Sequence, residues 1–164
     1  MLFLPKTILL KKKLLLPAVF CLTFASCTKI DVFEKNLAFK NHEWPSSIKP
    51  SIEFAITDTT SLYNIFVVIR HSDAYKYNNL WLNVYIQPPG DSVTKRTVEL
   101  PLADNKKGWL GSGMDDIFEH RIAITDPVQF KKQGTYRFTF EQIMRDDPLE
   151  EIYNVGLRIE KVNQ

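Results

Sequence analysis

Cys27 ends an N-terminal segment whose residue types predict covalent attachment of a lipid. The segment carries its basic residues first, continues with an apolar stretch over 14–24, and places the small residues Ala25 and Ser26 directly before the cysteine. This order is typical of a secretory signal and its cleavage site. We therefore expect a lipoprotein signal peptide over residues 1–26. The mature chain would begin at Cys27, with the thiol carrying a membrane anchor outside the cytoplasm.

Two other interpretations of this segment are open. A permanent transmembrane anchor needs roughly 20 apolar residues, whereas the run over 14–27 is interrupted by Pro17. An ordinary cleaved signal would leave Cys27 as a lone extracytoplasmic thiol, and Phe24 stands where the lipid-attachment pattern commonly has Leu. Thr28 follows the cysteine, so the Asp that retains some lipoproteins in the inner membrane is absent. The outer membrane is therefore the favoured location within the cell envelope.

Removal of the signal reverses the formal charge of the chain. Four of the 21 Lys and Arg residues and none of the 19 Asp and Glu residues lie in the signal, so a net charge of +2 becomes −2. The longest basic runs of the mature chain are pairs, such as Lys106-Lys107 and Lys131-Lys132. Nucleic-acid binding requires a basic patch and is not expected. No cysteine follows Cys27, so a packed core has to supply the stability that a disulfide could otherwise add.

The histidines His42, His71 and His120 are the first candidates for a metal or catalytic site. They are 29 and 49 residues apart and lack the H-x-x-x-H or H-E-x-x-H spacing of helical zinc sites. A zinc site needs three or four converging ligands, for which the sequence offers no support. We therefore interpret the histidines as surface or strand-end residues and expect neither a metal nor a cofactor.

The acidic pairs Asp115-Asp116 and Asp146-Asp147 could supply paired carboxylates for acid–base catalysis. Adjacent carboxylates are more commonly solvated turn residues, and the second pair directly precedes a proline. A calcium site that includes Glu150 would lack the spacing and the glycine of an EF-hand loop. The sequence therefore predicts no catalytic residues.

The glycine-rich segment 108–113 matches no catalytic loop. Ser112 is flanked directly by glycines, which differs from G-x-S-x-G, and no G-K-[ST] follows as in a phosphate-binding loop. We interpret the glycines as positions that allow positive φ in a tight crossing, with Trp109 as an apolar plug. Trp109 is also a candidate for a surface that binds a partner or a glycan.

Trp81 and Tyr85 are the main candidates for such a binding surface. They share one face of an expected strand with the amides Asn83 and Gln87, because side chains two residues apart in a strand point to the same side. Aromatic rings beside amides can stack on sugars or cover a protein partner. The rings could equally form the second layer of a sandwich core, so three interpretations are open here.

From residue 51 onward the hydrophobic period is two, which is typical of half-buried strands. The segment 63–70 is almost continuously apolar and predicts a central strand covered on both faces. We expect an all-β antiparallel sandwich of about seven to eight strands over residues 51–164, either immunoglobulin-like or jelly-roll-like. A closed barrel is the alternative. Residues 27–50 are expected to form a lipidated tether, since prolines interrupt them.

Five segments of the mature chain carry a family resemblance when they are taken together. They are YNIFVVIR at 63–70, YNNLWL at 77–82, WLGSG at 109–113, FEQIMR at 140–145 and VGLRIE at 155–160. In order and spacing over roughly residues 50–161, and in the lipoprotein start, the chain resembles the gliding-motility lipoproteins of the GldH type from Bacteroidetes.

The resemblance implies a membrane-anchored component of the gliding machinery, linked to type IX secretion, that acts by protein–protein interaction. The implied partners are other gliding or secretion proteins and, through Cys27, the membrane. No enzymatic activity, catalytic residue or small-molecule substrate is implied. His71 stands where we would expect a small polar residue such as Asn. The alternative function is that of a glycan-binding cell-surface lipoprotein, which requires Trp81 and Tyr85 to be exposed to solvent.

Overall fold

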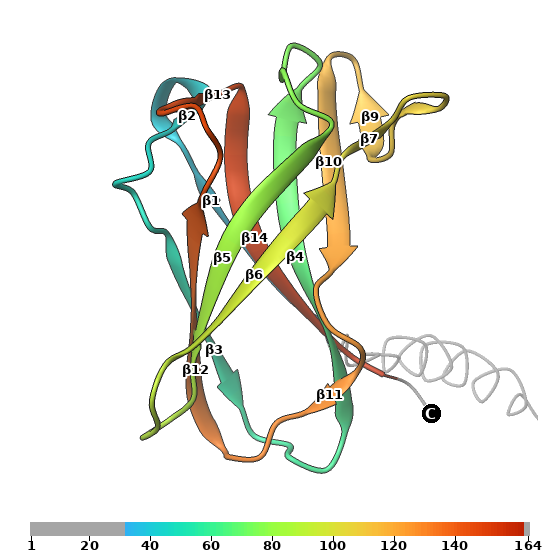
Figure 1. Cartoon of the computed structure of the whole chain (residues 1–164). Helices are drawn as coiled ribbons and strands as arrows, with labels where there is room; N and C mark the ends of the chain where they lie inside the picture. Colours follow the sequence, from blue (N-terminus) through green and yellow to red (C-terminus); the bar gives the residue numbers. More distant parts are fainter. Residues whose placement is uncertain (1–31, 163–164) are drawn as a thin grey trace, which may run out of the picture. The chain divides into compact units, whose positions relative to one another are not determined.

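The computed structural model describes residues 32–162, so the expected signal peptide and Cys27 lie outside the described residues. The described chain forms eight strands of six residues or more (Figure 1). These are β1 (Val32–Ala38), β3 (Ser51–Ile56), β4 (Leu62–Ser72), β5 (Asn79–Gln87), β6 (Thr94–Pro101), β10 (Ile117–Ala123), β12 (Gly134–Gln142) and β14 (Ile152–Lys161). The shorter elements are the 3-10 helix η2 (Lys40–His42) and the strands β2 (Glu43–Trp44), β7 (Ala103–Asp104), β8 (Gly108–Trp109), β9 (Ser112–Met114), β11 (Val128–Gln129) and β13 (Leu149–Glu150).

The eight long strands form two antiparallel sheets. The first has the order β1-β14-β4-β10, with β9 added beyond β10 and with β11 paired to β4. The second has the order β3-β12-β5-β6. Except at the β5–β6 hairpin, each long strand is followed by one in the opposite sheet. The predicted antiparallel sandwich is confirmed, and its connectivity is that of a jelly roll rather than of a closed barrel.

The core consists of the inner faces of the two sheets, because each strand alternates between buried and exposed side chains. In β12 the residues Phe138 and Phe140 are fully buried, whereas Arg137 beside them is exposed. In the neighbouring β5, Leu82 and Val84 are fully buried on the same inner face. Burial of one such side chain stabilises the fold by roughly 1.5–3 kcal/mol. The period-two pattern of the sequence therefore has its physical origin in this interface.

The folded domain begins before residue 51, which corrects the expected tether over 27–50. Strand β1 pairs with β14 along its whole length, and its residues Phe33 and Leu37 pack against the core. Trp44 in β2 is fully buried and stacks on Phe39, with ring centroids 4.7 Å apart. The prolines of this segment exclude a helix but not an edge strand. The apolar alternation of β1 involves only two residues, so it gave little signal in the sequence.

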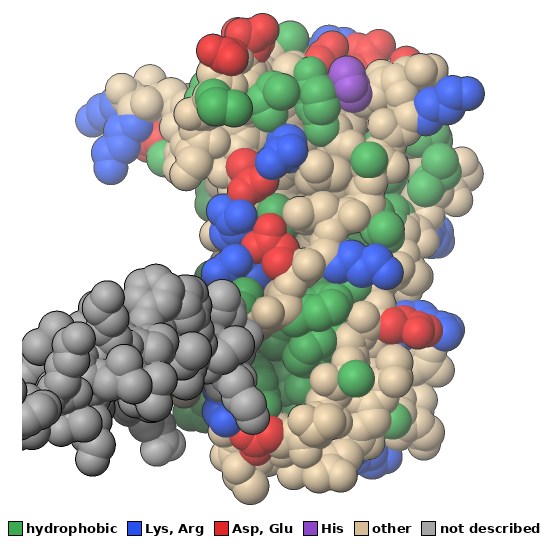
Figure 2. All heavy atoms as spheres, turned by 180° about the vertical axis from the view of Figure 1, so that it is seen from behind, with side chains coloured by type: hydrophobic (Ala, Val, Ile, Leu, Met, Phe, Trp, Pro, Cys, Tyr) green, Lys and Arg blue, Asp and Glu red, His purple; other side chains and the backbone are tan. Residues whose placement is uncertain are grey.

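The inner face of β4 is buried as expected, whereas the described residues cover its outer face only in part, since Val68 is fully buried there and other residues are not. Leu62 is 43% exposed and Phe66 is half-buried. Acidic and basic side chains alternate on this rear face of the domain (Figure 2). Glu34 accepts hydrogen bonds from Arg121 Nε at 3.1 Å and from Arg158 Nη1 at 2.7 Å. Burial raises the pKa of Glu34, but these hydrogen bonds outweigh it and lower that pKa to about 2.

Gly156 in β14 allows β1 to pack closely against it. A Cβ atom at this position would overlap Oδ1 of Asn36 and would lie 2.8 Å from the carbonyl oxygen of Lys35. We predict that Gly156→Ala lowers the free energy of unfolding by about 1–3 kcal/mol, the usual cost of overpacking, in urea titrations. The double variant Asn36→Ala/Gly156→Ala should recover part of this loss, since it removes the nearer obstacle. Wild-type stability of Gly156→Ala would contradict the close packing.

Candidate functional site

Trp81 and Tyr85 lie on the outer face of the β3-β12-β5-β6 sheet. Trp81 is 39% exposed and Tyr85 is half-buried. Leu82 and Val84, which alternate with them along β5, point into the core. The interpretation of the two rings as a second core layer is therefore wrong. Trp81 has the exposure that a binding surface requires, whereas Tyr85 has it only in part. We refer to this side of the second sheet as the outer β5 face.

Glu141 of β12 lies at the centre of the outer β5 face. Lys49 Nζ is 2.5 Å from its Oε1, and its Oε2 accepts hydrogen bonds from Tyr85 Oη at 2.6 Å and from Asn83 Nδ2 at 2.9 Å. The hydrogen bonds from Lys49, Tyr85 and Asn83 lower the pKa of Glu141 to about 2. The carboxylate is therefore ionised at neutral pH, and the Tyr85 hydroxyl is committed to it. The ring of Tyr85 is the part left for a partner.

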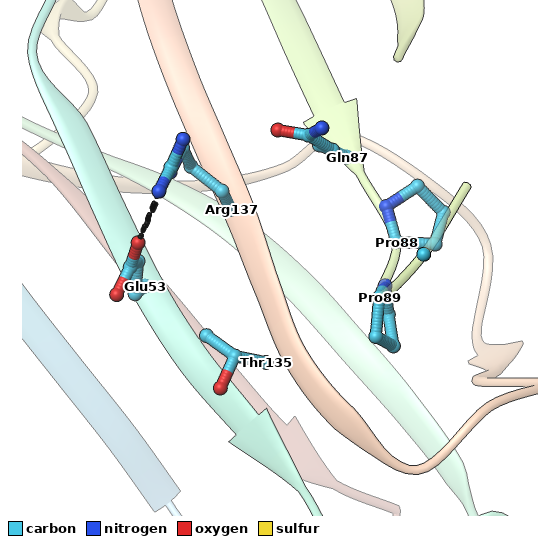
Figure 3. Close-up of a pocket in the computed structure, with 7 residues that line it drawn as sticks. Glu53, Gln87, Pro88, Pro89, Thr135 and Arg137 are labelled. Carbon is cyan, nitrogen blue, oxygen red and sulfur yellow. Dashed lines mark hydrogen bonds and ion pairs between the residues drawn. The ribbon is translucent and has the colours of Figure 1, made fainter. Parts of the chain in front are cut away.

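The far end of β5 carries a polar pocket of about 380 Å³ on the same face (Figure 3). Gln87 and the prolines Pro88 and Pro89 form one side of it. On the other side Arg137 and Glu53 point toward each other, with Arg137 Nη2 2.7 Å from Glu53 Oε1. The pocket lies six residues along β5 from the tryptophan, which corresponds to about 20 Å. These amide, guanidinium and carboxylate groups can exchange hydrogen bonds with a partner.

Trp81 forms the apolar end of the outer β5 face. Its backbone N–H donates to Met144 Sδ at 3.2 Å, and its carbonyl oxygen accepts from Ile143 N at 3.1 Å. Ile143 is 42% exposed, so two large apolar residues are accessible next to each other. Exposed tryptophans are enriched among the residues that dominate binding energies at protein interfaces. An apolar end, an ionised centre and a polar pocket together suit contact with another macromolecule.

Trp109 does not belong to this face. It lies in β8, is half-buried, and packs against the hydrophobic core. Its ring centroid is 4.4 Å from that of His71 and 5.7 Å from that of Phe118. This position fits the interpretation of Trp109 as an apolar plug. The three aromatic candidates named from the sequence therefore do not form one surface.

His71 and His120 form a buried pair that the sequence analysis did not predict. They are 0% and 3% exposed, and their Nε2 atoms are 2.9 Å apart. Nδ1 of His71 lies 2.6 Å from the carbonyl oxygen of Ser72, which can only accept, so Nδ1 carries the proton. Nε2 of His71 is then the acceptor and Nε2 of His120 the donor. The expectation of surface or strand-end histidines is wrong for His120, which is buried inside β10, while His71 lies near the end of β4 but is buried. The expectation is correct for His42, which is exposed.

The sequence did contain a signal for this pair. His71 continues the inner-face series of β4, in which every second residue is buried, through Val67 and Ile69. His120 occupies the corresponding position in β10, on the same face as Phe118 and directly opposite Ile69 in the pairing with β4. Local motifs could not find the pair, because 49 residues separate the partners and only the β4–β10 pairing brings them together.

The acidic pairs are turn residues, as their neighbours in the sequence suggested. Asp147 accepts hydrogen bonds from Ser46 N at 2.8 Å and Ser46 Oγ at 2.6 Å. Glu150 forms an ion pair with Lys76 at 2.6 Å, and Asp115 adopts a positive φ of 56°.

Within residues 32–162 no group of three or more His, Cys, Asp or Glu side chains is placed to hold a metal ion. That part of the chain also contains no helix with the length and apolarity to cross a bilayer.

The histidine pair predicts a pH-dependent stability. Burial lowers the pKa of His71, and burial together with the neighbouring His71 lowers the pKa of His120 to about 4. Unfolding returns both groups toward a pKa of about 6.5, so below this pH the unfolded chain binds more protons and stability falls as pH falls. We expect the free energy of unfolding to decrease by about 1–2 kcal/mol between pH 7 and pH 5 in urea titrations.

The variants His120→Gln and His42→Gln provide the matched test. His120→Gln should reduce the pH dependence, because it removes one of the two buried groups that resist protonation. His42→Gln removes an exposed histidine and should leave the dependence unchanged. Glu34 and Glu141 do not interfere, because their ordinary and lowered pKa values both lie below this pH window. An unaltered slope in His120→Gln would contradict the assignment.

Two solved structures overlap with the chain at low similarity. A carbohydrate-binding module specific for non-crystalline cellulose, CBM28, is 11% identical with a TM-score of 0.41, covering 79% of this chain and 72% of the module. Dimeric latent PorU from Porphyromonas gingivalis is 10% identical with a TM-score of 0.39, covering 82% of this chain and 13% of PorU. Neither overlap is close enough to carry an argument about function.

Sequence relatives give a much closer match. The model of the GldH lipoprotein family matches residues 31–159. A gliding motility lipoprotein GldH homolog from Christiangramia forsetii is 32% identical over 145 residues, covering 84% of this chain and 88% of the relative. The gliding motility lipoprotein GldH of Flavobacterium johnsoniae is 31% identical over 143 residues, covering 83% and 88%. These matches extend through both sheets, and the chain therefore belongs to the GldH lipoprotein family.

Proposed function

We propose that this protein is a membrane-anchored component of the bacterial gliding machinery, linked to type IX secretion, and that it acts through protein contacts rather than catalysis. The observation that carries the proposal is the match of residues 31–159 to the GldH family, together with two relatives named gliding motility lipoproteins. The outer β5 face supports a contact role, because Trp81 and Ile143 are exposed there beside polar groups.

A lipid on Cys27 would hold the domain close to the membrane. Strand β1 begins at Val32, five residues after the cysteine. An extended chain spans at most about 3.6 Å per residue, so the first strand would start within about 18 Å of the anchored residue. Confinement near one surface raises the effective concentration of other proteins in the same membrane, and a weak interface then suffices.

Cys27→Ser tests the anchor. We predict that the variant leaves the membrane fraction, because the thiol that carries the lipid is absent, whereas the wild type sediments with the outer membrane after density-gradient separation. Cells that depend on this protein should then lose spreading on agar. Cys21→Ser is the matched control, because it changes a cysteine inside the expected signal and should leave the fractionation unchanged. Firm membrane association of Cys27→Ser would contradict the lipid anchor.

Trp81→Ala tests the contact surface. We expect the wild type, purified from detergent-solubilised membranes, to recover other motility lipoproteins. Trp81→Ala should lower the recovered amount at least tenfold, because a buried interface tryptophan typically contributes 2 kcal/mol or more. Met114→Ala is the control, since Met114 is 80% exposed but lies in β9, far along the chain and in the other sheet. Recovery of the bait alone would contradict a role through protein contacts.

Glycan binding is the second candidate function, because the exposed Trp81 and the half-buried Tyr85 share the outer face of β5 with the amides Asn83 and Gln87. Affinity electrophoresis in gels that contain soluble polysaccharides separates the two functions. If a polysaccharide retards the wild type and Trp81→Ala abolishes the retardation, the face binds glycans. If migration is unchanged in every polysaccharide while Trp81→Ala loses its protein partners, the protein-contact function is supported.

A further inference from the structure

Figure 1 shows β6, the edge strand of the second sheet, on the same side of the domain as β10 and β11 of the first sheet. Two pockets are lined by residues from both of these edges, and we call the opening that they form the lateral cleft. Strand β6 pairs only with β5, so its other edge has no partner strand among the described residues. Strand β9 covers β10 only over 117–119, which leaves residues 120–123 of β10 without a second neighbour. Two sheet edges with unused main-chain hydrogen-bonding groups therefore flank one opening.

Two pockets lie along this cleft. The hairpin pocket, next to the β5–β6 turn, has a volume of about 300 Å³ and reaches the core residues Ile65 and Phe130. The loop pocket, next to the glycine-rich segment, has a volume of about 560 Å³ and is lined by Leu110 and Ile122 among others. The loop pocket extends along β10 to Ala123, and the hairpin pocket includes residue 125. The two pockets thus follow one another along the same sheet edge.

The hairpin pocket has an excess of positive charge. Arg96, Lys131 and Lys132 line it together with a single carboxylate, that of Asp91. Lys132 Nζ is 2.9 Å from this carboxylate, whereas the structure gives Arg96 and Lys131 no ion-pair partner among residues 32–162. Arg96 pairs with the inward-facing Val84 in the β5–β6 ladder, so it lies on the cleft side of β6. Two cationic groups are therefore available to a ligand in an otherwise acidic mature chain.

Thr125 adds an unused hydrogen-bonding group. Its Oγ1 atom is buried and has no hydrogen-bond partner in the described part of the chain, and the residue lines the hairpin pocket. Burial of a hydroxyl without a partner is unfavourable. A carboxylate or carbonyl oxygen of a ligand that came within hydrogen-bonding distance of Oγ1 would satisfy this group. The unpaired hydroxyl and the unpaired cations thus converge on the same chemistry, an acceptor with negative charge.

We propose that this cleft binds an extended segment of a partner protein, which adds as a strand beside β6. On the side that faces the cleft, the segment carries a carboxylate between two apolar side chains. The carboxylate lies near Arg96 and Lys131, and the apolar side chains enter the two pockets. In strand addition the main-chain bonds supply affinity, and pockets for alternate side chains supply specificity. This inference rests on the proposed function, because it names the chemistry of a protein partner.

A synthetic peptide serves as the test ligand. The capped sequence Ser-Leu-Thr-Glu-Thr-Ile-Ser with a fluorescent label places Leu, Glu and Ile on one face when extended. Two control peptides have the same length. One replaces Glu by Lys, and the other, Ser-Leu-Thr-Thr-Glu-Ile-Ser, moves Glu to the opposite face without changing composition. Fluorescence anisotropy with the detergent-solubilised mature protein should show binding of the first peptide and at least tenfold weaker binding of both controls.

Variants of the cleft locate the binding. Arg96→Glu/Lys131→Glu should weaken the peptide at least tenfold, because both attractive charges become repulsive. Thr125→Val should weaken it about threefold to tenfold, the range of one hydrogen bond, and should not lower the melting temperature, because it removes an unpaired hydroxyl. Lys40→Glu, an exposed change in η2, is the control and should bind as the wild type does.

Amide hydrogen exchange shows where the peptide binds, which a change of affinity caused by charge alone would not show. The bound peptide should slow amide exchange in β6 and leave β1 and β3, edge strands on the opposite side of each sheet, unchanged. Equal affinity for the three peptides, unaltered affinity of Arg96→Glu/Lys131→Glu, or protection at β1 or β3 would each overturn the cleft as the docking site.

The outcomes for the cleft and for the proposed function are distinguishable. If Arg96→Glu/Lys131→Glu still recovers motility proteins from membranes in wild-type amounts and the peptide does not bind, the cleft inference is overturned and the proposed function stands. If the peptide binds as described but the wild type recovers no protein from membranes, the proposed function is overturned, and the cleft keeps its peptide specificity.

Discussion

Mutual burial of two sheet faces is the interaction on which the rest of this structure depends. No cysteine follows Cys27, so no cross-link within the described domain can replace the core. Phe138 and Phe140 of one sheet and Val67 and Ile69 of the other are fully buried between the layers. Because each strand contributes only every second residue to this interface, the other half of its residues remains free for the outer faces.

The outer faces of the two sheets carry different kinds of side chains. The first sheet carries an ion-pair network centred on Glu34 and Glu119, in which opposite charges satisfy one another. The second sheet exposes Trp81 beside the Glu141 network and the pocket near Arg137. Ion pairs that satisfy one another offer little to a partner, whereas an exposed tryptophan with polar surroundings offers both apolar area and hydrogen bonds. The edge strands of the sheets differ as well. Two pockets lie beside β6, together with two cationic side chains that have no ion-pair partner among the described residues.

The sequence predicted the strands more reliably than the contacts between them. Period-two alternation is a local property, and it located β3, β5, β12 and β14 and assigned Leu82 to the core. It failed at β1, where an edge strand with two apolar residues looks like a polar linker. For Trp81 and Tyr85 the strand face was predictable, but not whether that face met solvent or a second layer. The charge excess around Arg96 was not predictable, because its members come from separate turns and strands.

The sequence by itself predicted a secretion and lipid signal around Cys27 and determined the all-β class and the GldH family, because each follows from residue types and their order along the chain. Only the tertiary structure decided the jelly-roll connectivity, the pairing of His71 with His120, and the separation of Trp109 from Trp81. These features depend on which distant strands become neighbours. That choice is made by packing of whole sheet faces, and no local pattern encodes it.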